Sequence, residues 1–206
     1  MSSPHPPAQP PPTTPGVFHD YGALSAAVTK WNTDQTLWES IHGHVSGWDT
    51  SRVEDMHELF AGISSASNPF NDDISAWDVS RVETMSFMFD RAENFNQELN
   101  AWDVSRVTNM NSAFYRTILF DQELQDWDVS KVGNMAGTFS QSNFNKPLGQ
   151  WDTSEVTTMF RTFWNAISFN QRDIRRSPST RWACNSWRSR CCSPRATRCA
   201  PSARPT

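Results

Sequence analysis

A phrase of about 25 residues recurs through the middle of this chain, and one copy reads FNQELNAWDVSRVTNMNSAFYRTIL from Phe95. Tryptophan returns at intervals of 29, 25, 25 and 24 residues: Trp48, Trp77, Trp102, Trp127 and Trp151. Methionine keeps the same intervals: Met56, Met85, Met110, Met135 and Met159. A fixed period of this size is typical of solenoids, in which each supersecondary unit buries its apolar face against the next unit.

The second half of each unit predicts a short helix. Ser105 is followed by Val107, Met110 and Phe114, and the other copies keep these offsets of two, five and nine residues. These offsets place the three apolar side chains on one stripe of a helix. The serine is then positioned to cap the first turn with its hydroxyl group. The predicted helix caps are Ser51, Ser80, Ser105, Ser130 and Ser154.

The first half of each unit is too short for a second helix, and its apolar positions, such as Leu99, Trp102 and Val104, suit a half-buried extended segment. We therefore predict an α/β repeat solenoid of about five units, each an extended segment plus a short helix, behind an N-terminal helical cap. Because helices pack farther apart than paired strands do, such an array bends, with the extended segments on its concave side.

Two polar columns follow the same period. An Asp follows each Trp, as Asp103 follows Trp102, and an Asn follows the repeated Phe, as Asn96 follows Phe95. A ladder of metal ligands is one interpretation of these columns. We favour a structural one, because Asn and Asp at tight turns bond neighbouring backbone groups.

The phrase FNQ-x-L-x-x-WDVS-x-VTNM-x-x-x-F resembles the repeat of the BspA-like leucine-rich-repeat surface proteins, also called the mycoplasma-type surface lipoprotein repeat. The resemblance covers roughly residues 22 to 174. It implies an α/β solenoid, a surface or secreted location, and an interaction role for which no catalytic residue carries over. This N-terminus shows neither a signal peptide nor a lipobox cysteine, so the compartment stays open.

The two ends of the chain differ from the array. Residues 1–17 are rich in proline and are expected to be disordered, residues 18–47 to form the cap, and residues 48–174 to form the array. Residues 175–206 hold all four cysteines and many arginines, without any repeat. This tail is interpreted as disordered or as out-of-frame translation, and a basic tail associated with nucleic acid is the alternative. No run of residues is apolar and long enough to span a membrane.

Other candidate sites are weaker. His42, His44 and His57 lie near Asp49 and Asp55 and could hold a metal, but a turn that leads into the first repeat is the preferred interpretation. Phe87, Phe160 and Trp164 are either core residues or aromatic anchors for a partner. We predict no metal and no cofactor.

The sequence favours a non-catalytic interaction scaffold that binds a protein or a glycan. A truncated repeat fragment without its own function is the alternative, and nucleic-acid binding is a further one. The ligand-binding residues are predicted at the variable positions of the extended segments: Asp73, Ser75, Glu98, Asn100, Glu123 and Gln125. Because repeat arrays need polar terminal units, self-association is predicted through the uncapped C-terminal end.

Overall fold

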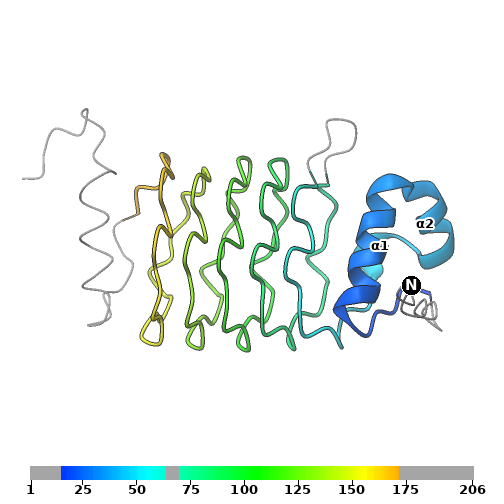
Figure 1. The fold of residues 1–206 in the computed structure, drawn as a ribbon, viewed down its shortest axis with the longest axis horizontal. Coiled ribbons are helices and arrows are strands. Elements are labelled where there is room, and N and C mark those ends of the chain that lie inside the picture. The colour runs from blue at the N-terminus through cyan, green and yellow to red at the C-terminus, as the bar shows by residue number, and fades with distance from the viewer. Residues whose placement is uncertain (1–14, 64–69, 172–206) are drawn as a thin grey trace, which may run out of the picture.

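The computed structural model describes residues 15–63 and 70–171. Two α-helices, α1 (Tyr21–Thr33) and α2 (Gln35–His42), and one 3-10 turn, η1 (Val45–Gly47), come first along the chain. The helices lie at one end of a row of coiled chain turns (Figure 1). The predictions for residues 1–14 and 172–206, including the basic tail, concern residues outside the described ranges.

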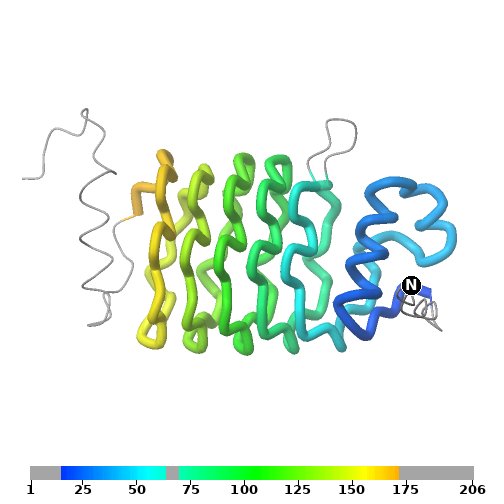
Figure 2. Tube along the Cα trace, in the orientation of Figure 1, coloured from blue at the N-terminus to red at the C-terminus, as the bar shows by residue number. Residues whose placement is uncertain are grey.

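Each repeat copy forms one layer of that row. We number the layers 1 to 5 in chain order, as 48–63, 70–94, 95–119, 120–143 and 144–168. The layers stand side by side, and successive layers follow one another in sequence (Figure 2). Within a layer, the FN segment runs from the repeated Phe to the Trp (95–102 in layer 3), and the turn segment starts at the Met (110–116 in layer 3).

The predicted α/β architecture is wrong. No layer contains a helix in its described residues, and neighbouring layers are joined by isolated parallel bridges rather than by strands of a sheet. Those bridges pair residues that occupy the same place in successive layers: Asp55 with Thr84, Thr84 with Asn109, Asn109 with Asn134, and Asn134 with Thr158. The argument for a concave side depended on the missing helices, so we describe the surface by segment instead.

The backbone of the turn segment explains why the helix does not form. Met110, Ser112, Phe114 and Arg116 donate their amide hydrogens to carbonyl oxygens of layer 4 over 2.8–3.0 Å. The amides between them bond within the turn, as Ala113 does to Met110. A helix would instead direct every amide to the carbonyl four residues back. The same pattern of four bonds recurs at each interface between layers 1 and 5.

This alternation requires left-handed backbone at two positions of each turn segment, the second and the sixth residue after the Met. In layer 3 these residues are Ser112, with φ of 53°, and Arg116, with φ of 55°. Glycine occupies such a position only at Gly62 and Gly137. A non-glycine residue in this region costs roughly 1–2 kcal/mol, so the bonds between layers must offset that cost.

The serines therefore have a different role from the predicted one, because no helix begins at them. The amide of Ser105 donates to the Asp103 carboxylate over 3.0 Å, and the corresponding Asp and Ser pairs form the same bond in the other layers. The Asp after each Trp thus closes a tight turn, as Asp residues commonly do.

The core consists of aromatic columns that run along the row. The five repeated tryptophans are each at most 4% exposed, and the stacked pair Trp102 and Trp127 has ring centroids 6.5 Å apart. Phe114 stacks between Phe89 and Phe139, at 5.3 and 5.4 Å. Four of the five repeated methionines are buried, and Met159 of layer 5 is half-buried. A large apolar side chain buried in this way contributes about 1.5–3 kcal/mol.

Polar side chains also form hydrogen bonds between neighbouring layers. The indole nitrogen of Trp127 donates to the Leu99 carbonyl oxygen of the preceding layer over 2.8 Å. The amide of Asp121 donates to the side-chain oxygen of Asn96 over 3.0 Å, and Asn145 donates in turn to Asp121 over 2.7 Å. Each layer thus fixes the register of the next one through side chains as well as backbone.

The helices cover the first layer. Asp20 caps α1 by accepting from the Ala23 amide, and α1 buries Leu24, Ala27, Val28 and Trp31. The Trp31 ring packs edge-on against Trp48 at 5.7 Å. In contrast, α2 has no buried residue. The end of the aromatic column at layer 1 is therefore shielded by α1.

Candidate functional site

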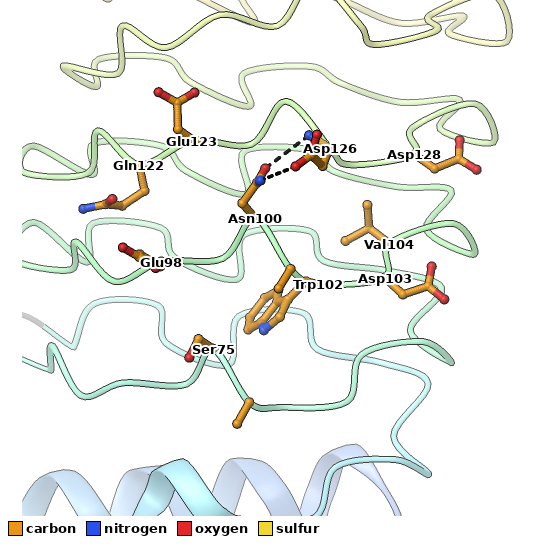
Figure 3. Close-up of a pocket in the computed structure, with 12 residues that line it drawn as sticks. Ser75, Glu98, Asn100, Trp102, Asp103, Val104, Gln122, Glu123, Asp126 and Asp128 are labelled. Carbon is orange, nitrogen blue, oxygen red and sulfur yellow. Dashed lines mark hydrogen bonds between the residues drawn. The ribbon is translucent and has the colours of Figure 1, made fainter.

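A groove of about 900 Å³ runs across the FN segments of layers 2, 3 and 4. Figure 3 shows Glu98 and Glu123 on adjacent layers at one end of the groove, and Asp103 and Asp128 at the other end. Five carboxylates line the groove, and no basic side chain does: Glu98, Asp103, Glu123, Asp126 and Asp128.

The FN segment positions these side chains by alternation. Leu99 is fully buried, whereas Glu98 is exposed and Asn100 is half-buried. Layer 4 repeats the arrangement with buried Leu124 and exposed Glu123. Because the buried leucines hold their segments against the core, the glutamates are presented to solvent at a regular spacing.

A hydrogen-bonded pair crosses the middle of the groove. The Asn100 side-chain amide donates to the Asp126 carboxylate over 2.6 Å, and the Asp126 backbone amide donates back to the Asn100 side-chain oxygen over 3.1 Å (Figure 3). This two-way contact holds the side chains of layers 3 and 4 in one arrangement. It leaves the second carboxylate oxygen of Asp126 available to a partner.

The carboxylates at the other end of the groove are held by the turns. Asp128 accepts from the Ser130 amide over 3.0 Å, and hydrogen bonds from Ser130 lower the pKa of Asp128. A carboxylate whose charged form accepts hydrogen bonds keeps its charge to lower pH. The charge of this residue is therefore present throughout the neutral range.

Four of the six predicted binding residues line the groove: Ser75, Glu98, Asn100 and Glu123. Asp73 and Gln125 do not. The Asp73 carboxylate accepts from the Ser75 amide over 2.9 Å, and hydrogen bonds from Ser75 lower its pKa. Asp73 thus closes a local turn beside the groove.

Sequence reasoning missed three acids of the groove, Asp103, Asp126 and Asp128. Asp103 and Asp128 belong to the invariant column after the Trp, which we assigned wholly to turns. They serve the turns and line the groove as well. Asp126 stands where other repeats have Ala76, Ala101 or Gln150, and that departure from the repeat was the available signal.

The three histidines of the candidate metal site have separate surroundings. His42 stacks on Trp38 at 4.5 Å, His44 lies edge-on to Trp31 at 5.1 Å, and His57 stacks on Tyr21 at 4.2 Å. Within the part of the chain that the structure describes, no group of three or more His, Cys, Asp or Glu side chains is arranged to hold a metal ion.

The comparisons with known proteins place the chain in a family. The family model described as "Mycoplasma protein of unknown function, DUF285" matches residues 16–142 and, in a second overlapping match, residues 98–186. The chain therefore belongs to this family. No curated protein and no solved structure matches the chain. None of the helices in the described ranges has the length and apolar character needed to cross a membrane.

Proposed function

We propose that this protein is a non-catalytic interaction module that binds a basic segment of a protein partner in the groove across layers 2 to 4. The observation that carries the proposal is the charge of the groove, which is lined by five carboxylates and no basic side chain. None of these carboxylates forms an ion pair with a residue in the described ranges. Facing charges of opposite sign steer association and select partners.

The arrangement of the groove favours an extended partner. Four of its five acids occupy equivalent places in layers 3 and 4, Glu98 with Glu123 and Asp103 with Asp128, so equivalent charges face outward on neighbouring layers. An extended basic segment laid across the layers can meet these charges one after another. The Asn100 and Asp126 pair adds fixed hydrogen-bonding groups between the two ends.

A binding role also agrees with what the groove residues do chemically. Asp103 and Asp128 accept hydrogen bonds from backbone amides of the turns, and Asn100 and Asp126 bond each other. These groups are engaged in holding the surface in shape. A general acid or base would instead need a pKa near the working pH.

The test is the double reversal E98K/E123K, measured with an oligolysine peptide as the probe by isothermal titration calorimetry. We expect the affinity for the peptide to fall at least tenfold, because the variant removes two attractive charges and adds two repulsive ones. The matched control is E54K/E83K, which makes the same change in net charge at two exposed glutamates outside the groove.

A specific groove predicts that the control keeps most of the affinity. Equal losses in the two variants would show attraction to the overall negative charge and would contradict the proposal. A second reversal, R106E/K131E, changes two exposed basic residues between the FN and turn segments. If only this variant lost the peptide, the binding surface would have to lie elsewhere.

A further inference from the structure

A second hollow lies on the turn segments of layers 3 to 5, away from the FN segments that form the acidic groove. Its volume is about 250 Å³. Phe160 and Trp164 line it and are 66% and 37% exposed. In the earlier layers the places of these two rings are taken mostly by small or polar residues, such as Ala136 and Ser140. The aromatic character of this surface therefore belongs to layer 5 and is not required by the repeat.

The guanidinium group of Arg161 lies over both rings. The central carbon of its guanidinium group is 4.9 Å from the centroid of the Phe160 ring and 5.2 Å from that of Trp164. Arginine over an aromatic face is attracted by the ring and loses side-chain freedom. Arg161 forms no ion pair with a carboxylate in the described residues. Its guanidinium group is thus a positioned cation with hydrogen-bond donors left for a ligand.

The other walls of the hollow are polar and partly fixed. Gln141 donates to the Tyr115 hydroxyl group over 2.8 Å, and Ser140 donates to the Trp164 carbonyl oxygen over 3.2 Å. Gly137 also lines the hollow; its φ is 66°, and a Cβ atom there would meet the Ser112 hydroxyl oxygen at 2.9 Å. Hydroxyl and amide groups therefore surround a pair of aromatic rings and one cation.

From this arrangement we propose that the hollow binds one unit of an acidic saccharide, with the sugar carboxylate on Arg161 and the sugar ring against Phe160 and Trp164. A planar guanidinium matches a carboxylate with two parallel hydrogen bonds. The aromatic rings supply apolar area for the C–H face of the sugar, and the serine, glutamine and tyrosine groups can meet its hydroxyl groups.

The size and charge of the hollow favour this occupant over a protein surface. Its 250 Å³ is below the roughly 300–1,000 Å³ of sites for drug-sized ligands, so it suits a single ring. The described residues from 48 to 171 contain 18 acidic and eight basic side chains. The net charge of this region therefore repels an anion, and Arg161 supplies a local attraction at the hollow.

The experiment uses the full chain and two probes, the tetramers of galacturonate and of glucuronate, with the methyl ester of each as the uncharged match. Calorimetric titration should show binding of at least one acid tetramer and at least tenfold weaker binding of its ester. R161Q and W164A should each weaken the binding at least tenfold. R161K keeps the charge but not the planar fork, and we expect an intermediate loss.

The variant E98K/E123K serves as the control, because it changes the acidic groove and leaves the hollow intact. It should bind the acid tetramer at least as tightly as the unchanged chain does, because it removes negative charge and leaves Arg161 in place, so this test and that of the acidic groove can fail separately. Thermal unfolding of R161Q and W164A checks that both variants are folded, as their exposed positions predict.

Three outcomes would overturn the inference. They are no detectable binding of either acid tetramer, equal affinity for acid and ester, and unchanged affinity in R161Q. A glutamate oligopeptide should bind at least tenfold more weakly than the sugar acid. If it bound equally well through Arg161, the hollow would be a peptide site and the saccharide assignment would be wrong.

Discussion

The helical cap and the repeat layers satisfy their backbone hydrogen-bonding groups in different ways. In α1 and α2 the amides bond within the same helix, and Asp20 and Asp34 cap the two helix starts from one residue outside. In the turn segments alternate amides cross to the next layer, as Ser112 does to the Ala136 carbonyl oxygen over 2.8 Å. A helix therefore completes its backbone hydrogen bonds within itself, whereas a layer depends on its neighbours to complete them.

The aromatic side chains show the same contrast. Trp31 of α1 donates its indole hydrogen to the Asp72 carboxylate over 2.8 Å and packs edge-on against Trp48 of layer 1. Trp102 lies inside the row, where its ring stacks on Trp127 and its indole donates to the Ile74 carbonyl oxygen over 3.2 Å. A change in a layer should thus affect the layers on both sides. The effect of a change on α2 should be limited to the helices.

The largest expected effect is that of Trp102→Ala. Removing this buried ring leaves a cavity inside the row and removes the indole hydrogen bond to layer 2, so we expect a loss of about 3–5 kcal/mol in the free energy of unfolding. Urea denaturation measures it. Trp38→Ala on α2 is the control, because Trp38 is only half-buried and should cost less than half as much. Equal costs would show that the layers are no more cooperative than the cap.

Glycine should have opposite effects in the two regions. Ser112→Gly places glycine at a left-handed position of a turn segment. Glycine removes the steric cost of that backbone but raises the entropy of the unfolded chain, so we expect a net stabilisation of about 0.5 kcal/mol. Ala26→Gly, at an exposed site inside α1, should destabilise by about 1 kcal/mol. Thermal midpoints measured side by side check both signs. Destabilisation by Ser112→Gly would favour a helical turn segment after all.

Acid should weaken the two regions in different pH windows, and this is the smallest effect. Burial lowers the pKa of His42 in the cap from 6.5, so its contribution is complete above pH 6.5 and is lost as the pH falls through the lowered value. Hydrogen bonds from Ser51 and Ser130 lower the pKa values of Asp49 and Asp128 in the layers from 3.8. The contribution of these carboxylates is therefore complete above pH 3.8 and is lost below it.

Thermal midpoints measured from pH 7 to pH 2 distinguish the two windows. His42→Gln should flatten the dependence just below pH 6.5 and leave the acid end unchanged. Asp128→Asn should do the converse, because an asparagine oxygen can accept the same turn hydrogen bond without titrating. If both variants altered the same window, the assignment of the two groups to separate regions would be wrong.

The repeat was readable from the residues, but the conformation of its second half was not. Val107, Met110 and Phe114 are all buried, yet the spacing that indicated a helix stripe is also compatible with two successive tight turns. The left-handed positions include Phe87, Arg91 and Arg116, which carry no local sign of that conformation. Only the hydrogen bonds to the next layer make it favourable, and those bonds depend on residues about 25 positions away.

The acidic groove was predictable only in part, because some of its contacts join residues of different layers. Alternation about Leu99 and Leu124 is a local property, and it singled out Glu98, Asn100 and Glu123, which line the groove. The contact between Asn100 and Asp126 joins two layers, and no local sequence pattern predicts it. The sequence indicated the aromatic side chains of layer 5 but not Arg161, whose guanidinium group lies over them and whose backbone is left-handed, with φ of 59°.

By itself, the sequence determined the period of this protein, the membership of its aromatic columns and the turn that each Asp closes, because these depend on residue type and short spacing. The tertiary structure alone decided that the repeat is a stack of turns without helices, and which acids share a groove. The physical reason is that half of the turn-segment amides find their acceptors in another layer. The energy that selects the local conformation is therefore not local.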